Sequence, residues 1–278
     1  MSVRTACIIG WPVEHSRSPV IHKFWLKELG LEGDYIRRPV EPANIDAFLK
    51  AFPNSGLVGG NVTVPHKEAA FAAVANMDEA ARAIGAVNTL WIDGGRLVGG
   101  NTDTLGFLAN LDDLAKAWDK SPGPAVVLGA GGAARAVIWA LISRGFAPIH
   151  LVNRTLERAE ALAQRFGKSV KPMGWEALAA VLPTAKILVN TTSLGMAGAP
   201  DPEVDLALLP DDALVTDLVY VPLETGLLAS AKARGLATVD GLGMLLHQAA
   251  PGFERWFGKR PKVTPELRAA VLATIGKS

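Results

Sequence analysis

Two residues that follow short apolar runs in this sequence could do acid–base chemistry. Lys67 comes directly after residues 61–66, Asn-Val-Thr-Val-Pro-His, and Asp103 ends residues 99–103, Gly-Gly-Asn-Thr-Asp. An amine and a carboxylate can move a proton to or from a substrate oxygen. With Pro65 at the first position of a helix, Lys67 falls in the first turn, where a cation opposes the helix dipole. Each residue alone fits a structural role equally well, Lys67 as a solvated charge and Asp103 as a helix cap.

Hydroxyl and amide groups stand at similar junctions. Ser18-Pro19 before an amphipathic run is typical of a helix N-cap followed by the first helical position. That interpretation leaves Ser16 unexplained, and two hydroxyls beside a helix N-terminus also form a pocket for a carboxylate; the spacing supports both equally. Asn88, at the end of another apolar stretch, could bind a ligand or satisfy a turn. In open parallel sheets ligand groups collect at the carboxyl ends of strands, so these positions are candidates for one site.

A glycine-rich turn in the middle of the chain predicts a dinucleotide site. The pattern G-x-G-x-x-A is matched by Gly129-Ala130-Gly131-Gly132-Ala133-Ala134. It follows the apolar run 125–128 and opens a helical stretch, which is the context that gives the motif its meaning. The glycines allow a tight turn and a close approach of backbone to a pyrophosphate at a helix N-terminus. The alternative is a glycine-rich turn without a ligand.

The next predicted strand favours NADP over NAD. An NAD site usually has an acidic residue about 20 residues after the glycines, to bind the ribose 2′-hydroxyl. Here residues 150–152 are followed by Asn153, Arg154 and Thr155, with Arg158 one turn further on. Guanidinium groups suit a phosphate, so we expect Arg154 and Arg158 to bind the 2′-phosphate. The alternative is that both are solvated surface charges.

Alternating elements are expected to position these residues in the first third of the chain. Apolar runs predict strands over residues 4–9, 34–38, 57–62 and 87–92. Three- and four-residue apolar spacing predicts helices over residues 19–29, 43–52, 65–74 and 78–84. Such alternation predicts a mostly parallel sheet with helices on its faces.

The middle third repeats the pattern after a clear break. A helix over 104–118 ends at Ser-Pro-Gly-Pro, residues 121–124. Strands are then predicted over 125–128, 149–152, 187–189 and 214–218, and helices over 133–143, 156–166, 240–256 and 264–275. We therefore expect an α/β protein of two domains: a mostly parallel substrate-binding catalytic domain over 1–103 and a Rossmann-like, doubly wound domain over 104–241.

Composition narrows the function classes. The 278 residues are 49% hydrophobic and 20% charged, and 28 Lys+Arg against 27 Asp+Glu leave a net charge of +1. This balance argues against a nucleic-acid or acidic-membrane partner. The single cysteine, Cys7, is expected to be a small buried hydrophobe, and the five histidines lack metal-ligand spacing. No signal peptide or membrane-length apolar run is expected, so we predict a soluble, cytoplasmic protein without a metal.

With these residues in hand, the sequence resembles the shikimate dehydrogenase family. Nine segments carry the resemblance in order: 10–19, 61–67, 85–90, 99–103, 129–135, 153–158, 190–195, 217–220 and 241–248. The resemblance implies that residues 242–278 return to complete the N-terminal domain. It also implies an NADP-dependent oxidoreductase acting on a CH–OH group, which reversibly reduces 3-dehydroshikimate to shikimate, and the setting of chorismate and aromatic amino acid biosynthesis; a homodimer is possible.

The family's residue roles carry over by position. Lys67 and Asp103 would be the catalytic pair. The substrate would be bound by its carboxylate at Ser16 and Ser18, with further contacts from Thr63, Lys67, Asn88, Asp103, Tyr220 and Gln248. Cofactor contacts would come from Gly129, Ala130, Gly131, Gly132, Ala133, Asn153, Arg154, Thr155, Arg158, Thr191, Thr192, Leu218, Gly241 and Met244.

Three rival functions remain at this point. A quinate/shikimate dehydrogenase of broader substrate or cofactor use is the nearest; Ser18 in place of a threonine resembles the shikimate-selective members. A folate-type dehydrogenase gives no reason for the paired serines. A non-catalytic NADPH-binding sensor has no need of the Lys67 and Asp103 pair.

Overall fold

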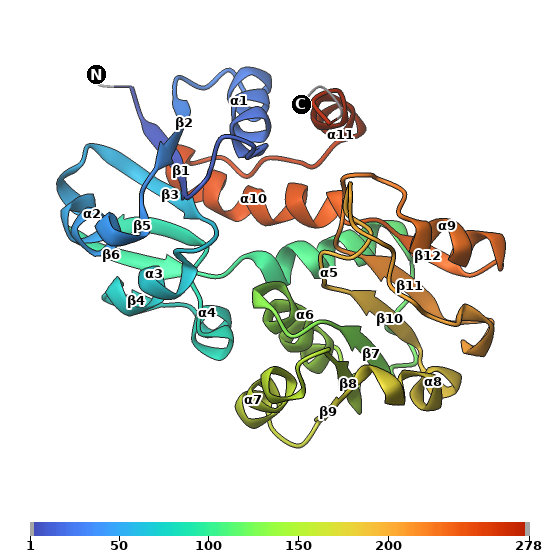
Figure 1. Cartoon of the computed structure of the whole chain (residues 1–278). Helices are drawn as coiled ribbons and strands as arrows, with labels where there is room; N and C mark the ends of the chain where they lie inside the picture. The colour runs from blue at the N-terminus through green and yellow to red at the C-terminus, as the bar shows by residue number, and fades with distance from the viewer. Residues whose placement is uncertain (1–2, 276–278) are drawn as a thin grey trace. The chain divides into compact units, whose positions relative to one another are not determined.

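The computed structural model describes residues 3–275, which form two compact units. Within these residues, the first unit runs to Asp103 and resumes at Leu246, and the second covers Thr104–Leu245. Each unit is built on a six-stranded sheet with helices packed against it (Figure 1). The predicted α/β class with two sheets is confirmed. Of the helices described, none is long and apolar enough to cross a membrane.

The first unit holds a mixed sheet of order β2-β1-β3-β5-β6-β4. Its strands are β1 (Thr5–Gly10), β2 (Asp34–Pro39), β3 (Leu57–Val62), β4 (Asn76–Met77), β5 (Thr89–Asp93) and β6 (Arg96–Gly100). Its helices are α1 (Ser18–Glu28), η1 (Pro42–Asn44), α2 (Ile45–Ala51), η2 (Phe52–Asn54), α3 (Lys67–Ala73), α4 (Glu79–Ile84) and α11 (Pro265–Leu272). The chain leaves this unit as α5 (Asp103–Leu114) begins and returns to it within α10 (Leu242–Phe257).

A hairpin makes the first sheet mixed, which the sequence analysis did not foresee. Gly94 and Gly95 both have positive φ, 55° and 75°, the conformation of a two-residue hairpin turn. The chain therefore reverses between β5 and β6, which pair antiparallel. Strand β5 also pairs antiparallel with β3 on its other side. Asn61 lies opposite Thr89, and Thr89 lies opposite Gly100. One row across three strands thus joins segments that are far apart in sequence.

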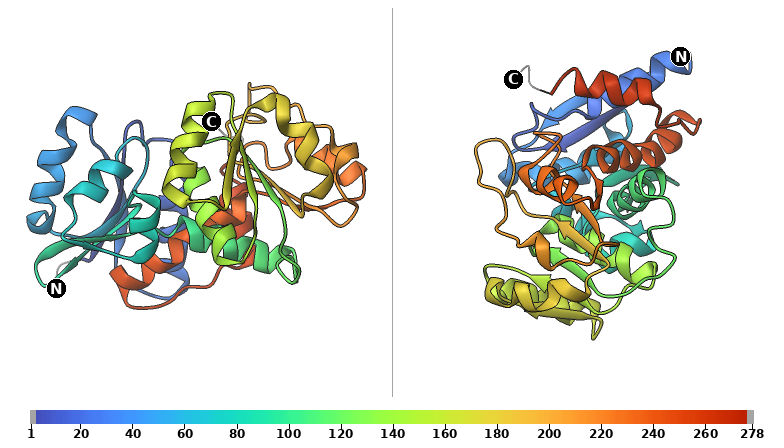
Figure 2. Two further views of the ribbon diagram at one scale, coloured as in Figure 1. Left: turned by 90° about the horizontal axis from the view of Figure 1, so that it is seen from below. Right: turned by 90° about the vertical axis from the view of Figure 1, so that its right-hand side faces the viewer.

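The two faces of the first sheet are covered by different parts of the chain. One face buries aliphatic residues of the strands against α2, α3 and α4, including Cys7 at the centre, as predicted. The other carries an aromatic cluster in which Trp25 of α1 meets Phe253 of α10. The Trp25 indole donates to the Lys262 carbonyl at 2.8 Å, and the right-hand view of Figure 2 shows α11 beside α1. The C-terminal helices therefore belong to the core of the N-terminal half.

The second unit has an all-parallel sheet of order β12-β11-β10-β7-β8-β9. Its strands are β7 (Ala125–Leu128), β8 (Ile149–Val152), β9 (Val170–Met173), β10 (Ile187–Asn190), β11 (Leu214–Asp217) and β12 (Ala237–Val239). Its helices include α6 (Gly132–Ser143), α7 (Leu156–Phe166), η3 (Trp175–Ala177), α8 (Leu178–Val181), η4 (Leu182–Thr184), η5 (Leu206–Leu208) and α9 (Gly226–Ala233). This is the doubly wound arrangement predicted.

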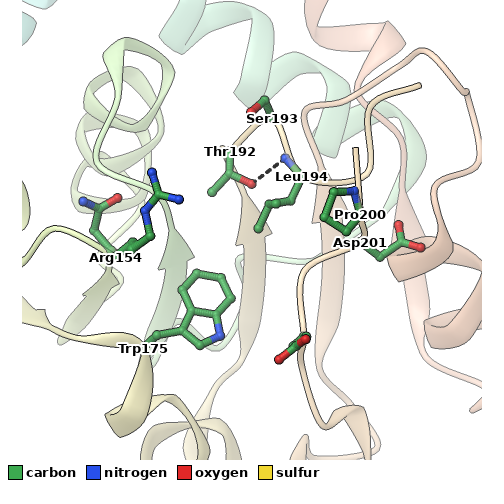
Figure 3. A pocket seen from close by; sticks show the side chains of 9 residues that line it. Arg154, Trp175, Thr192, Ser193, Leu194, Pro200 and Asp201 are labelled. Atoms are coloured by element: carbon green, nitrogen blue, oxygen red, sulfur yellow. Dashed lines mark hydrogen bonds between the residues drawn. The ribbon is translucent and has the colours of Figure 1, made fainter. Parts of the chain in front are cut away.

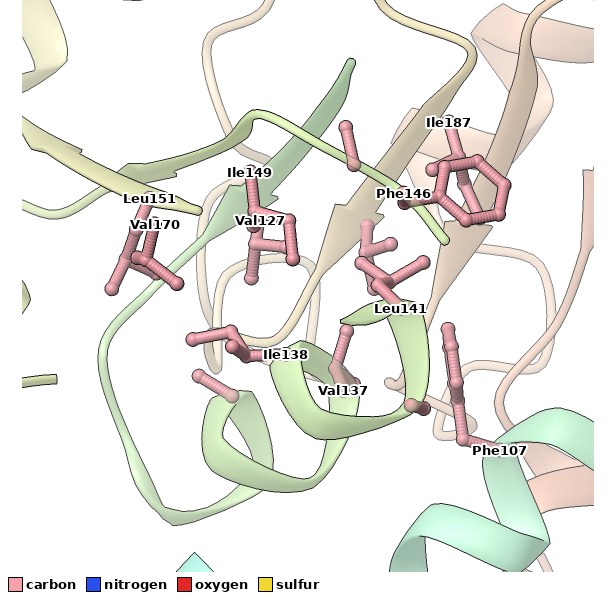
Figure 4. Close-up of a cluster of buried hydrophobic side chains, with 14 of the residues drawn as sticks. Phe107, Val127, Val137, Ile138, Leu141, Phe146, Ile149, Leu151, Val170 and Ile187 are labelled. Carbon is pink, nitrogen blue, oxygen red and sulfur yellow. The ribbon is translucent and has the colours of Figure 1, made fainter. Parts of the chain in front are cut away.

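Alternate strand residues face two separate cores in this unit. Val127 and Ile149 face a core shared with α6 and α7, shown in Figure 4, whereas Val126 and Leu188 face one shared with α8 and α9. Burying such a side chain contributes about 1.5–3 kcal/mol. Continuous apolar strands are the expected consequence of helices on both faces.

The helix predicted over 104–118 ends early. Helix α5 stops at Leu114, and Ala117 takes a positive φ of 67°. The Trp118 ring stacks on Phe146, and its Nε1 donates to Asp112 at 2.9 Å. These tertiary contacts turn the chain away from the helix axis.

Candidate active site

The first unit brings Lys67 and Asp103 together at the start of two helices. Lys67 Nζ lies 2.6 Å from Asp103 Oδ2, and their side chains keep 29% and 14% exposure. A charged pair this short is a strong, directional hydrogen bond. The partial exposure leaves both groups within reach of a ligand. An amine that can donate a proton and a carboxylate that holds it form an acid–base pair.

Asn88 connects the pair to the surrounding polar groups. Its Nδ2 donates to Asp103 Oδ1 at 2.8 Å and lies 3.5 Å from Gln248 Oε1. Its Oδ1 accepts from the Thr102 backbone amide at 2.9 Å. Gln248 comes from α10, so its return to this site needs the C-terminal part of the chain. Asn88, Asp103 and Gln248, named separately from the sequence, therefore lie in one hydrogen-bonded group.

The helix starts predicted around this site are wrong by one or two residues. Helix α1 begins at Ser18 itself, with Arg17 as N-cap, so Ser18 is not the cap. The Ser16 hydroxyl accepts instead from the Ser18 amide at 3.3 Å. Helix α3 begins at Lys67, not at Pro65, because the chain first makes a turn in which the His66 amide donates to the Thr63 carbonyl at 2.9 Å. Thr63 directly follows β3.

Asp103 does not cap the helix that it begins. Its carboxylate is occupied by Lys67 and Asn88, and the Asn101 side chain accepts from the Asp103 amide at 3.0 Å. The Asn101 amide group in turn donates to the Ala86 carbonyl at 2.9 Å. At the start of α5, Asn101 therefore accepts the hydrogen bond from the backbone, the kind of structural role that the sequence had left open for Asp103.

The glycine turn lies between β7 and α6 in the second unit. Gly129 has φ +96°, and a Cβ there would lie 2.7 Å from the Thr192 side chain. Added Cβ atoms at Gly131 and Gly132 would point into open space, so the backbone of the turn is approachable. Asn153 Oδ1 accepts from the Ala130 amide at 3.1 Å and holds the turn against the end of β8. Ala133 lies in the first turn of α6.

An open pocket of about 430 Å³ lies beside this turn. Figure 3 shows Arg154 and Trp175 facing it, opposite Leu194 and Pro200. Arg154 and Thr155 precede α7, and Arg158 lies in its first turn, all exposed. The indole of Trp175 in η3 was missed by the sequence analysis, because neither β9 nor η3 was predicted. Its nearness to Arg154 places a flat apolar surface beside a guanidinium group.

The remaining predicted cofactor residues follow the carboxyl ends of β10, β11 and β12, and Met244 lies in the first turn of α10. Thr191 Oγ1 donates to the Leu128 carbonyl at 2.7 Å, and Thr192 Oγ1 donates to Asn190 Oδ1 at 2.7 Å. A Cβ at Gly241 would meet the Leu218 carbonyl at 2.3 Å, so only glycine fits there. Met244 packs against the core formed with α6. Tyr220 lies in the segment after β11, in the second unit.

Asp217 anchors these loops from inside. It is fully buried and accepts from Asn190 Nδ2 and the Val219 amide, both at 2.9 Å, and from the Thr225 hydroxyl at 2.8 Å. Burial raises the pKa of Asp217, and these hydrogen bonds oppose the rise. The sequence offered no signal for this role except the position of Asp217 at a strand end.

A dinucleotide-binding turn on a parallel sheet and a separate amine–carboxylate pair define the class of protein: an α/β oxidoreductase that uses a nicotinamide dinucleotide. Three family descriptions match the chain. They are the shikimate dehydrogenase substrate binding domain over residues 8–90, shikimate / quinate 5-dehydrogenase over 113–198, and the shikimate 5'-dehydrogenase C-terminal domain over 241–272.

Individual relatives agree with these matches. The shikimate dehydrogenase (NADP(+)) of Chelativorans sp. (strain BNC1) is 59% identical over 274 residues, covering 99% of this chain and 98% of the relative. The shikimate 5-dehydrogenase of Thermus thermophilus, solved with NADP(H) and shikimate, is 39% identical, with a TM-score of 0.84 over 97% of this chain and 99% of that one. The quinate dehydrogenase of Corynebacterium glutamicum, solved with NAD, is 31% identical, with a TM-score of 0.89 over 98% and 99%. The chain belongs to the shikimate dehydrogenase family, which confirms the resemblance seen in the sequence.

Proposed function

We propose that this chain catalyses the reversible, NADP-dependent reduction of 3-dehydroshikimate to shikimate. The observation that carries the proposal is the Lys67–Asp103 pair at 2.6 Å, held by Asn88 beside Gln248. Relatives at 56–59% identity over nearly the whole chain are named as NADP(+) shikimate dehydrogenases. The arrangement supports a site that both binds ring hydroxyls and transfers a proton.

The proposed substrate site uses complementary groups. Hydroxyls of Ser16 and Ser18 at the start of α1 suit the substrate carboxylate, and Thr63, Asn88, Asp103 and Gln248 suit its ring hydroxyls. Ser18 is 4% exposed and so offers a largely desolvated donor. Tyr220 is proposed as a further substrate contact.

The proposed cofactor site fits NADP on three observations. The backbone at Gly131 and Gly132 is open, Gly129 has no room for a side chain, and Arg154 faces the pocket where an NAD-selective site would have an acid. Guanidinium groups of Arg154 and Arg158 suit a 2′-phosphate. Ala130, Ala133, Asn153 and Thr155 would surround the phosphates and ribose, and Thr191, Thr192, Leu218, Gly241 and Met244 would approach the nicotinamide.

The proton step falls to this chain. The reduced cofactor supplies the hydride to the carbonyl carbon at C3. Lys67 Nζ would donate a proton to the C3 oxygen as it becomes a hydroxyl, and would take it back in the reverse direction. Asp103 would orient both the amine and that oxygen, because it accepts from one and can accept from the other.

The same proposal extends to the metabolic route, the compartment and the assembly of the enzyme. An enzyme that makes shikimate serves the route to chorismate and the aromatic amino acids, and we place it in the cytoplasm. A homodimer is proposed as its assembly, which light scattering of the purified chain tests directly.

The deciding experiment follows the absorbance of reduced nicotinamide. Purified protein is given shikimate or quinate, each with NADP and with NAD. Fast reduction with shikimate and NADP alone is the expected result. Equal rates with quinate or NAD would favour the broader quinate/shikimate dehydrogenase. Cofactor binding without turnover of any ring substrate would overturn the proposal in favour of a sensor.

A further inference from the structure

Two buried polar side chains of the first sheet lie behind the proposed site without being part of it. Asn61 on β3 is 3% exposed and Thr89 on β5 is 1% exposed. Polar groups buried this deeply cost free energy unless their hydrogen bonds are made. The two residues lie opposite each other on the neighbouring antiparallel strands β3 and β5.

The direction of their hydrogen bonds is fixed by the chemistry of the partners. Asn61 Nδ2 donates to the Asn88 carbonyl at 3.3 Å, and a carbonyl can only accept. The same amide group therefore points its Nδ2 to Thr89 Oγ1, also at 3.3 Å. The Tyr35 hydroxyl completes this orientation by donating to Asn61 Oδ1 at 2.7 Å. Because Thr89 Oγ1 receives a hydrogen from Asn61, its own hydrogen is left for another acceptor.

That acceptor is Asn88 Oδ1, at 2.9 Å from Thr89 Oγ1. The Thr102 backbone amide donates to the same oxygen, also at 2.9 Å. These donors fix Oδ1 on their side and leave Nδ2 on the opposite side, where it donates to Asp103 Oδ1 at 2.8 Å. A flipped Asn88 amide would face the carboxylate with its oxygen and the Thr102 amide with its own N–H group. The Thr102 hydroxyl is a third, longer donor to this oxygen, at 3.2 Å. The hydroxyl of Thr89 is thus one of three groups that hold Asn88 with its Nδ2 toward Asp103.

We propose that Thr89 is a positioning residue for the reaction, which acts through Asn88 on Asp103. The Asn61–Thr89 pair holds the Asn88 amide so that its Nδ2 faces Asp103, and the carboxylate is thereby kept against Lys67 Nζ. This inference rests on the proposed function, because it assumes that Lys67 and Asp103 do the proton transfer.

The test compares Thr89→Val, which keeps the shape and removes the hydroxyl, with Thr89→Ser, which restores it. In the full-length enzyme we expect kcat for shikimate oxidation to fall about tenfold in Thr89→Val, the scale of one lost hydrogen bond. Thr89→Ser should stay within about threefold of the parent. Thr216→Val is the matched control, since Thr216 is a buried strand threonine of the second sheet, 1% exposed.

A double-mutant cycle separates positioning from a merely structural effect. If Thr89 acts through Asn88, adding Thr89→Val to Asn88→Ala should change kcat no further. A full additional loss in that background, or no loss in the single variant, would overturn the inference. Thermal unfolding of each variant shows whether it is folded. If the parent enzyme itself does not turn over shikimate with NADP, the proposed function fails first, which is a different result.

Discussion

The two units contain the same small motif put to different uses. In the first, Asn88 Nδ2 donates to Asp103, and in the second, Asn190 Nδ2 donates to Asp217. Asp103 has a lysine partner and 14% exposure, whereas Asp217 is fully buried and binds a backbone amide and a hydroxyl. The same asparagine–aspartate hydrogen bond therefore serves two purposes. Beside a lysine and partly exposed to solvent, it positions a carboxylate that a ligand can reach. Fully buried and without a cation, it anchors a loop.

The largest effect should come from removing the amine. Lys67→Met keeps the length of the side chain and removes its proton, so we expect kcat to fall by about 10²–10⁴-fold, the usual value of general acid–base catalysis. The KM for shikimate should change much less. Steady-state kinetics in both directions measures the split between the two constants. A collapse of affinity with turnover preserved would make Lys67 a binding residue only.

The carboxylate of the first unit should matter for rate and little for stability. Asp103→Asn is expected to lose turnover on a similar scale, with an unfolding free energy within about 1 kcal/mol of the parent, because the pair is partly exposed. Asp217→Ala, in contrast, should lower the stability of the protein strongly. It leaves three buried donors without an acceptor, at a cost of roughly 3 kcal/mol or more in unfolding free energy. Urea unfolding of both variants measures the contrast.

Asp217→Asn is the control for that contrast. It keeps one oxygen for the Val219 amide and for Asn190, so its loss should be well below that of Asp217→Ala. Equal losses would show that the negative charge, not the hydrogen-bond geometry, anchors the loops. Equal unfolding free energies for Asp103→Asn and Asp217→Ala would break the comparison between the two units.

A smaller, selective effect is expected on the cofactor side of the second unit. Arg154→Asp replaces a guanidinium facing the pocket with the acid typical of NAD sites. Losing charge-assisted hydrogen bonds to a phosphate should raise the KM for NADP about 10–100-fold. The KM for NAD should rise little or fall. Parallel titrations with the two cofactors test this, with Arg165→Asp in the last turn of α7 as control. Equal losses for NADP and NAD would contradict the assignment.

The positions of strand–helix junctions in the sequence were enough to predict candidate residues in each of the two units. Lys67, Asp103 and the Gly129 turn all follow apolar runs, and their residue types identify them. The hydrogen bonds around Asn88 could not be predicted, because they depend on the antiparallel pairing of β3 with β5, which sets Asn61 opposite Thr89. Likewise Trp175 follows β9, a strand whose Lys-Pro content hides it. Local sequence pattern indicates the candidate site residues, whereas lateral strand pairing decides which side chains hold them.

The last test concerns the pH dependence of stability through His22, which is buried in the aromatic cluster of the first unit. Its ring stacks on Tyr35 at a centroid distance of 4.0 Å, and burial lowers its pKa to about 3. Between pH 6.5 and 3 the unfolded chain takes up a proton at His22 and the folded chain does not. Stability should therefore fall as the pH falls through this window, by up to about 1.4 kcal/mol per pH unit from this residue.

His22→Phe should flatten this acid limb while keeping the aromatic stack. Urea unfolding at several pH values from neutral to acid measures the slope, and His15→Gln, an exposed histidine, is the matched control. An unchanged slope in His22→Phe would mean that another group governs acid unfolding. A flatter slope would show that His22 must stay uncharged in the folded first unit. The buried groups of the two units would then differ in a second way: acid weakens the first through a base that must remain neutral, whereas the raised pKa of Asp217 makes the second relatively more stable as the pH falls.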